Sequence, residues 1–247
     1  MADVTYERVV TYWQTKKIIN SAAMDVVVND VAVSMAYNST RIEVPTVNYQ
    51  DAKEIFKSGR VTEYTGFVKD ITSLQNAKFS WNAFLEAFED GCKLNEALVK
   101  DFHRVLTMGT FDEKRYREGE RPGHYKKGDF VTGRYEIGAL AEDVPEEMDE
   151  LLQDVQDVPP EKALTAAAFF HAKFENIHPF ADGNGRTGRL LMNYLLVLHD
   201  HPIIVIHEED KKGYMEALEA WDTKQELEPL KEYLKEQAVK TWSHRIR

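Results

Sequence analysis

Apolar residues recur at helical spacing along most of the chain, which predicts a mainly α-helical protein. Two apolar runs, residues 163–174 and 190–198, have the length and the hydrophobicity of buried helices. A polar segment rich in glycine, residues 178–189, separates them. The same spacing predicts further helices over residues 5–20, 24–43, 48–58, 68–88, 94–106 and 227–242, and one that begins at Val144.

The apolar run from Met24 to Met35 leaves a strand open as an alternative, because several of its residues are β-branched valines. Its length, its lack of glycine and proline, and its polar interruptions favour a helix. Pro45 disfavours helical backbone angles at Val44, so we expect this helix to end near Glu43.

The segment 178–189 combines groups that suit a phosphate site. Its Gly-Asn-Gly run at 183–185 can turn successive N–H groups toward one concave side. A helix that starts near Gly185 adds its unpaired N–H groups and the positive end of its dipole. Arg186 and Arg189 are spaced to share one helix face, where two guanidinium groups would bind a di- or triphosphate.

Two further side chains of this segment suggest a reaction. Asp182 is an oxygen ligand beside the glycines, and Mg²⁺ is usually bound by one or two carboxylates together with substrate phosphates. His178 has a reference pKa near neutrality, which suits a general base that removes a hydroxyl proton. Each group has an ordinary alternative, namely a turn, a core histidine or a solvated helix face. Their combination in one loop between two buried helices favours a site.

The residues from His178 to Arg189 fit the pattern His-x-Phe-x-Asp/Glu-Gly-Asn-Gly-Arg-x-x-Arg at every defined position. The chain therefore resembles the Fic domain proteins, a helical family that mostly transfers AMP from ATP to a hydroxyl side chain of a target protein. The resemblance implies that His178 deprotonates the target hydroxyl and that Asp182 holds Mg²⁺ on the α- and β-phosphates. It implies phosphate binding by Gly183, Asn184, Gly185, Arg186 and Arg189. We interpret Phe180 as a core residue that holds the loop rigid.

An N-terminal stretch, Ser39-Thr40-Arg41-Ile42-Glu43, resembles the inhibitory motif Ser/Thr-x-x-x-Glu-Gly/Asn of Fic proteins that restrain themselves. The resemblance implies that Glu43 contacts Arg189 in the place of the γ-phosphate, with Ser39 on the same helix face. Val44 departs from the motif, which requires Gly or Asn there. The alternative is that Glu43 is an ordinary acidic residue at a helix end.

Two further regions resemble parts of the family. The polar segment 107–136 contains several glycines and Pro122, and from Arg121 onward it resembles the β-hairpin flap that pairs with an extended target segment. The alternative is a surface loop. Residues 212–221 resemble the wall of the adenine pocket, with Tyr214 as the expected contact, although an aromatic residue there would also suit the core.

The resemblance divides the chain into an N-terminal helical arm, residues 1–60, and a Fic catalytic domain, residues 61–247, whose core spans about 94–222. The expected fold is mainly α, a helical bundle with a small β-hairpin flap.

The composition bears on the compartment of the protein and on the classes of partner that it could bind. The net charge is −11, from 31 basic and 42 acidic residues, and this excess of acidic residues does not indicate nucleic-acid binding. Cys92 is the only cysteine, which excludes an intramolecular disulfide. No apolar run is long enough to span a membrane, so we expect a cytoplasmic protein with no membrane partner. A homodimer is left open.

The sequence thus predicts a protein adenylyltransferase that uses Mg²⁺ and ATP and is restrained by Glu43. Its partner would be a protein that presents a Ser, Thr or Tyr hydroxyl in an extended segment. One rival is phosphoryl transfer, as in the Doc toxins, which characteristically have lysine at the position of Gly185. The others are removal of AMP, with Glu43 positioning a water, and a nucleotide-binding interaction module with little turnover.

Overall fold

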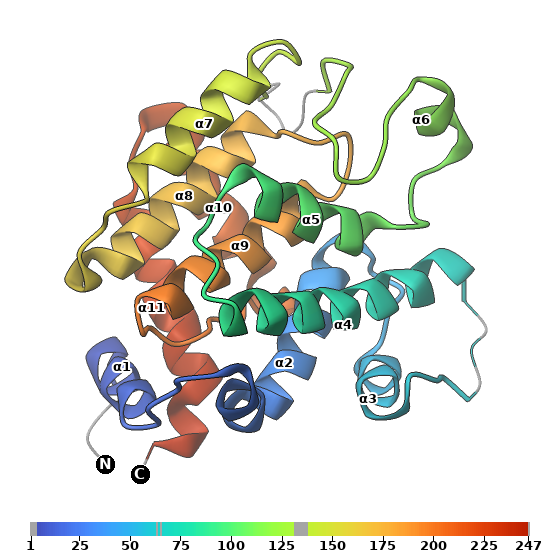
Figure 1. Ribbon diagram of the computed structural model, residues 1–247. Coiled ribbons are helices and arrows are strands. Elements are labelled where there is room, and N and C mark those ends of the chain that lie inside the picture. The colour runs from blue at the N-terminus through green and yellow to red at the C-terminus, as the bar shows by residue number, and fades with distance from the viewer. Residues whose placement is uncertain (1–3, 63, 65, 131–137, 247) are drawn as a thin grey trace.

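A computed structural model describes residues 4–62, 64, 66–130 and 138–246, and within these ranges the chain is helical and contains no strand (Figure 1). The prediction of a mainly α fold is confirmed. The helices are α1 (Tyr6–Gln14), α2 (Ser21–Glu43), α3 (Tyr49–Ser58), α4 (Val68–Glu89), α5 (Glu96–Thr107), α6 (Glu113–Arg117), α7 (Val144–Asp154), α8 (Ala163–Ile177), α9 (Asn184–Leu198), α10 (Lys211–Lys224) and α11 (Glu228–Trp242), with 3₁₀ turns η1 (Pro160–Lys162), η2 (Glu208–Asp210) and η3 (Ser243–Arg245).

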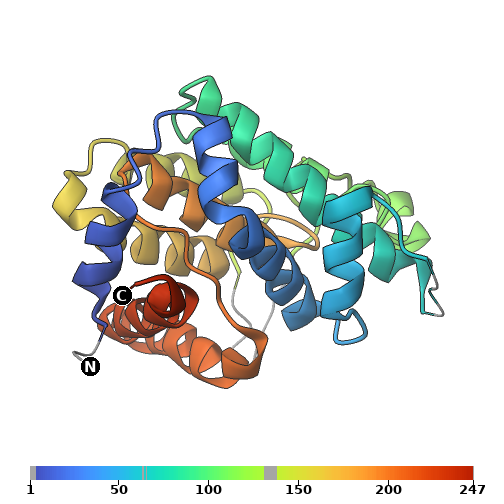
Figure 2. The ribbon, with the colours of Figure 1, turned by 90° about the horizontal axis from the view of Figure 1, so that it is seen from below.

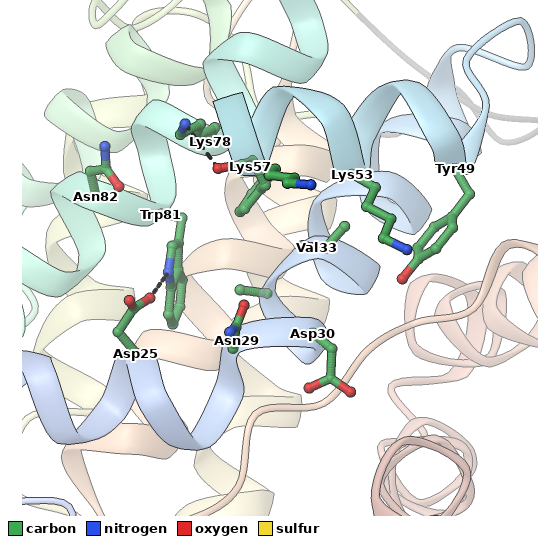
Figure 3. Close-up of a pocket in the computed structure, with 12 residues that line it drawn as sticks. Asp25, Asn29, Asp30, Val33, Tyr49, Lys53, Lys57, Lys78, Trp81 and Asn82 are labelled. Carbon is green, nitrogen blue, oxygen red and sulfur yellow. Dashed lines mark hydrogen bonds between the residues drawn. The ribbon is translucent and has the colours of Figure 1, made fainter. Parts of the chain in front are cut away.

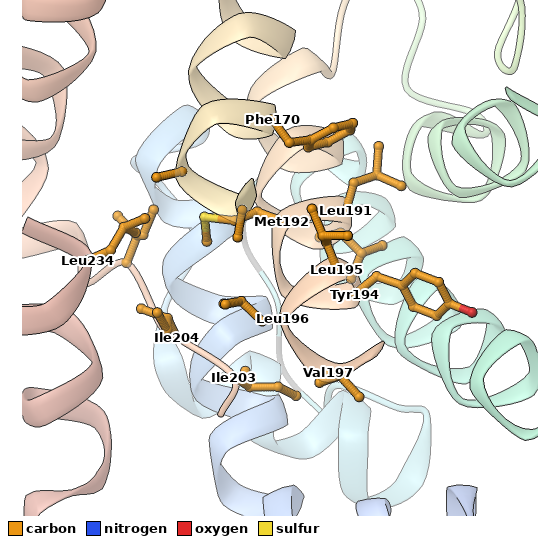
Figure 4. Packing of buried hydrophobic residues seen from close by; sticks show 14 of the residues in the cluster. Phe170, Leu191, Met192, Tyr194, Leu195, Leu196, Val197, Ile203, Ile204 and Leu234 are labelled. Atoms are coloured by element: carbon orange, nitrogen blue, oxygen red, sulfur yellow. The ribbon is translucent and has the colours of Figure 1, made fainter. Parts of the chain in front are cut away.

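Helix α9 lies at the centre and is buried on nearly all sides, because its apolar residues point in every direction (Figure 4). It packs against α8, α5 and α2, while α7, α10 and α11 pack against α8. The Asn193 side chain accepts a hydrogen bond from the N–H of Ile204 and donates one to its carbonyl, at 2.7 and 3.0 Å. These bonds tie the extended segment after α9 to the helix itself.

The N-terminal arm shares the core of the rest of the chain. Helix α2 crosses the molecule and packs against α4 and α9 (Figure 2). Helix α1 packs on α11, where the rings of Trp13 and Trp242 meet edge to face at 5.6 Å. The predicted division of the chain at residue 60 remains a prediction, but buried residues of the arm and of the central helices belong to one apolar cluster.

Several helix ends lie where local signals predict them. Asn48 caps α3, its side chain accepting from the N–H of Asp51 at 2.9 Å, and Gly59 ends the helix at φ 71°. Helix α2 ends at Glu43, as Pro45 requires. Val44 has φ −123°, an extended angle that any residue adopts, so this turn needs neither Gly nor Asn.

The predicted β-hairpin flap is not seen: residues 107–130 contain no strand, and residues 131–137 lie outside the described residues. Single contacts hold this segment in place of a strand ladder. The N–H of Lys126 donates to the carbonyl of Pro179 at 2.9 Å, and the Glu120 carboxylate accepts from the N–H groups of Lys127 and Gly128. The short helix α6 in this segment was not predicted.

A cavity of about 510 Å³ lies between α2, α3 and α4 and includes no residue of the segment 178–189 (Figure 3). Its lining is mixed: Asp25 accepts a hydrogen bond from the indole N–H of Trp81 at 3.2 Å, and Lys53 and Lys57 come from α3. Lys78 donates to two carbonyls at the end of α3. Within the described residues, no helix has the length and hydropathy needed to cross a membrane.

Candidate functional site

Two residues in left-handed backbone conformation shape the loop between α8 and α9. His178 ends α8 with φ 51°, and Gly183 precedes α9 with φ 82°. A Cβ atom added to Gly183 would lie 2.4 Å from Cγ2 of Thr107, so only glycine fits at this position. The loop therefore leaves one helix and enters the next at the same end of the bundle.

The Asn184 side chain closes the loop. Its carbonyl oxygen accepts from the N–H of Phe180 at 2.9 Å, and its amide donates to the carbonyl of Phe180 at 2.7 Å. The first intrahelical bond of α9 runs from Thr187 N–H to Gly183 O. The N–H groups of residues 184–186 therefore have no intrahelical acceptor and are available to an anion. Asn184 would thus contribute its main chain, rather than its amide, to a phosphate site.

Phe180 packs beneath the loop, as its interpretation as a core residue requires. It is fully buried and stacks on the His103 ring with centroids 3.6 Å apart. His103 Nδ1 accepts from the N–H of Gly123, and Nε2 lies 2.9 Å from the carbonyl oxygen of Asp182, to which it donates. Burial lowers the pKa of His103 to about 3, so the imidazole is neutral. Its two hydrogen bonds join α5 to the loop at Asp182 and to the segment 107–130 at Gly123.

His178 lines a pocket of about 240 Å³ together with Glu43, Arg115, Ala181, Asp182, Gly183, Asn184, Gly185 and Arg186. Its Nδ1 is buried and has no hydrogen-bond partner among the described residues. Burial and, to a smaller extent, the nearby Lys126 ammonium lower the pKa of His178 to about 4. The imidazole is therefore neutral at pH 7 and can accept a proton.

Asp182 lies between two guanidinium groups. Nη2 of Arg186 is 3.5 Å from Oδ1, and Nη2 of Arg115 is 3.7 Å from Oδ2. Arg186 is only 5% exposed, yet its Nε and Nη1 have no partner within the described part of the chain. Burial lowers its pKa. Leaving buried donors unpaired is unfavourable, so an anion bound here would relieve the cost.

Arg189 is bound to the N-terminal arm. Its Nε donates to Oγ of Ser39 at 3.0 Å, and its Nη2 donates to the Ser39 carbonyl at 2.9 Å and to Oε1 of Glu43 at 3.0 Å. Burial alone would lower the pKa of Arg189, but Tyr214 and the carboxylates of Glu43 and Glu175 outweigh it and raise the pKa. The structure thus brings together His178, Asp182, Arg186, Arg189, Ser39 and Glu43.

Tyr214 lies behind Arg189, in the core. It is 1% exposed, and its hydroxyl lies 2.7 Å from Nε2 of His171 and 3.5 Å from Nη1 of Arg189. It is not among the residues that line the pocket. This position is compatible with the core alternative, and the contact with adenine stays a prediction.

Two residues of this region escaped the sequence analysis. Arg115 reaches the pocket from α6, and no periodic pattern marks it in its polar segment. Glu175 lies in the last turn of α8, where burial raises its pKa to about 8. An acidic residue four positions after His171, directly beyond the apolar run 163–174, was the available signal.

The donor set around the loop fits Mg²⁺ bound together with a nucleotide. Within residues 4–130 and 138–246, as far as they are described, no group of three or more His, Cys, Asp or Glu side chains could hold a metal alone. Mg²⁺ needs only one or two protein carboxylates when phosphates supply other ligands, and Asp182 is such a carboxylate beside the free N–H groups of α9.

Comparison with known proteins agrees with this geometry. Residues 93–196 match the model of the Fic/DOC family. Protein adenylyltransferase fic-1 of Caenorhabditis elegans is 26% identical over 205 residues, which is 81% of this chain and 38% of the relative. Protein adenylyltransferase Fic of Nematostella vectensis is 50% identical over 52 residues, 21% of this chain and 12% of the relative. The chain thus spans well under half the length of these relatives.

Solved structures share the fold. A Fic domain containing signaling protein from Bacteroides thetaiotaomicron superposes with a TM-score of 0.81 at 23% identity, covering 98% of this chain and 95% of that one. A Fic family protein from Desulfovibrio desulfuricans gives 0.72 at 23% identity, covering 98% and 74%. Residues 93–196, which include the segment 178–189 at this pocket, form a Fic domain of the Fic/DOC family.

Proposed function

We propose that this protein transfers AMP from Mg-ATP to a Ser, Thr or Tyr hydroxyl of a target protein. The observation that carries the proposal is one pocket that holds a neutral His178, the carboxylate of Asp182 and the free N-terminal end of α9 with Arg186. Relatives named protein adenylyltransferase support the same activity.

In this mechanism His178 accepts the proton of the target hydroxyl, because its imidazole is neutral and faces the pocket. The hydroxyl oxygen forms a bond to the α-phosphorus of ATP, and the bond from that phosphorus to the bridging oxygen of the β-phosphate breaks. Pyrophosphate leaves, and the proton stays on His178 until it passes to solvent.

Arg186 and the N–H groups at the start of α9 would bind the phosphates. Nε and Nη1 of Arg186 have no partner within the described residues, and these N–H groups have no intrahelical acceptor. Asp182 would hold Mg²⁺. A bound Mg²⁺ supplies positive charge that stabilises the leaving pyrophosphate.

We further infer that Glu43 restrains the reaction. Its carboxylate is bound to Arg189, which in the active state would contact the terminal phosphates. It also crowds the start of α9, since a Cβ atom on Gly185 would lie 2.6 Å from Oε1 of Glu43. While the pair persists, the carboxylate occupies space and hydrogen-bond donors that a triphosphate would need.

Gly185 argues against phosphoryl transfer, because the Doc toxins characteristically have a lysine at this position. Removal of AMP remains the second candidate function. The observation in its favour is that the Glu43 carboxylate lines the same pocket as His178 and could orient a water molecule there.

The test uses ATP labelled either at the α- or at the γ-phosphate, with a cell lysate as the source of targets. AMP transfer predicts that only the α-label reaches protein and that His178→Ala abolishes it. His244→Ala, at an exposed position of η3, is the control and should leave labelling unchanged. Labelling from γ-labelled ATP would show phosphoryl transfer, and loss of label from an AMP-modified protein would show removal. Equal labelling by His178→Ala and wild type would overturn the proposal.

A further inference from the structure

Arg115 enters the pocket from outside the loop that forms its floor. It lies on α6, in a segment joined to the loop by two connections. The N–H of Lys126 donates to the carbonyl of Pro179, and the N–H of Gly123 donates to His103, which in turn donates to the carbonyl of Asp182. The pocket therefore has basic side chains on two sides, Arg186 from α9 and Arg115 from α6.

The guanidinium of Arg115 is held in place on one side only. Its Nη1 donates to Oδ2 of Asp112, whose Oδ1 accepts the N–H of Arg115. Its Cζ lies 6.0 Å from the centre of the Phe111 ring. On the pocket side, Nη2 is 3.7 Å from Asp182, longer than a hydrogen bond, and the buried Nε has no partner among the residues that the structure describes.

The charges around Asp182 indicate what these donors bind. Arg115 and Arg186 approach the two oxygens of one carboxylate, and neither contact is shorter than 3.5 Å. A divalent cation on Asp182 would take up that negative charge and leave both guanidinium groups facing the pocket. A planar guanidinium with free donors suits a phosphate oxygen, which accepts two parallel hydrogen bonds.

We propose that Arg115 is a phosphate-binding residue of this site, a third arginine that contacts the phosphate chain of the nucleotide from the side opposite α9. This inference rests on the proposed function, because it requires a nucleotide in the pocket. It assigns a role to Asp112 as well: this residue positions Arg115. The alternative is that the ion pair of Arg115 with Asp182 only fastens α6 to the loop.

The test is equilibrium binding of the Mg²⁺ complex of α,β-methylene ATP, whose α–β linkage resists cleavage, by titration calorimetry. All variants carry Glu43→Gly, so that the carboxylate does not compete. Arg115→Met should weaken binding about tenfold, as the loss of a charge-assisted contact predicts. Arg115→Lys keeps the charge without the planar fork and should give an intermediate loss.

Arg117→Met is the matched control, because Arg117 lies on the same helix with a side chain that is 73% exposed and paired with Glu113. Binding by Arg115→Met and Arg115→Lys within twofold of this control would overturn the inference and leave the proposed function standing. Absence of binding by the control itself would instead overturn the proposed function, and the inference with it. A thermal midpoint equal to that of the control shows that Arg115→Met is folded. If the midpoint of Arg115→Met is lower, the binding measured for Arg115→Lys tests the inference.

Discussion

Nη2 of Arg189 donates a 3.0 Å hydrogen bond to Oε1 of Glu43, across a contact between α9 and the last residue of α2. Arg189 is 4% exposed, whereas the Glu43 side chain is 39% exposed. The arginine is thus fixed by the core, and the glutamate is the partner that can leave.

Glu43→Gly should raise both AMP transfer and affinity for Mg-ATP by about tenfold or more. Hydrogen bonds to charged groups contribute about 1.5–3 kcal/mol, and about 1.4 kcal/mol corresponds to a factor of ten. The measurement is α-label incorporation together with calorimetric titration. Glu86→Gly, at an exposed position of α4, controls for glycine in a helix. Unchanged incorporation would show that Glu43 does not restrain the site.

Ser39→Ala should produce a weaker version of the same effect, about fivefold in AMP transfer. The substitution removes the hydroxyl that accepts from Nε of Arg189, but the Ser39 carbonyl still accepts from Nη2. Ser34→Ala on the same helix is the control. A Ser39→Ala effect as large as that of Glu43→Gly would contradict the view that the carboxylate is the main restraint.

The pH dependence of kcat/KM should report the lowered pKa of His178. With a pKa of about 4, nearly all of the imidazole is still neutral at pH 5.5, whereas an unperturbed histidine would be about nine-tenths protonated there. Because only the neutral form accepts a proton, kcat/KM should be flat from pH 7.5 down to 5.5 and fall only at lower pH. A fall centred near pH 6.5 would show that burial does not lower this pKa.

Glu175 should make stability depend on pH in the opposite sense to a surface carboxylate. Burial raises its folded pKa to about 8, above the unfolded value near 4.5, so the folded state binds more protons between these limits. Its contribution to the free energy of unfolding is therefore present at low pH and lost as pH rises through this window, by at most about 1.4 kcal/mol per unit.

Comparison with Glu175→Gln isolates this contribution, because the buried histidines are common to both proteins. Chemical denaturation at pH 5 and pH 7.5 should show the stability of wild type falling relative to that of the variant as pH rises. Parallel stabilities at the two pH values would mean that Glu175 ionises normally. Arg189, Glu43 and Asp222 are the charges that act on Glu175 besides its burial.

Asn184→Ala should disable the site through the shape of the loop. The substitution leaves the buried N–H and carbonyl of Phe180 without their side-chain partner, at a cost of about 1–3 kcal/mol for each group. AMP transfer should fall by more than tenfold, and the thermal midpoint should fall too. Asn184→Asp keeps the acceptor for Phe180 N–H but places a second acceptor against the Phe180 carbonyl, so it should also lose stability. Full activity of Asn184→Ala would show that the loop does not depend on this clamp.

Features of the fold and of the site could be predicted from the sequence where the signal for them is local. Asn48, Gly59 and Pro45 mark helix ends through their own backbone preferences, and the structure has those ends. The chemistry of the segment 178–189 could be inferred because its groups are adjacent in the chain. Their convergence on one pocket follows from a single loop between two helices.

The features that could not be predicted depend on contacts between residues distant in the sequence, and no periodic pattern indicates such contacts. Arg115 reaches the pocket only because its segment is tied to His103 and Pro179. No strand of the predicted hairpin is seen over residues 107–130, where the Glu120 carboxylate accepts from the N–H groups of Lys127 and Gly128. The hydroxyl of Tyr214, the predicted adenine contact, lies near His171 and Arg189 inside the protein, and no local pattern indicates these two partners.

The burial of α2 limits how the site can be opened. Met24, Val28, Val31 and Ile42 all insert into the apolar cluster that also contains the central helices, so lifting the helix away would expose much of that cluster to water. Movement of the whole α2 helix away from the site is therefore unfavourable. Opening on the scale of one side chain, a rotation of Glu43 out toward solvent, leaves the rest of the helix where it is.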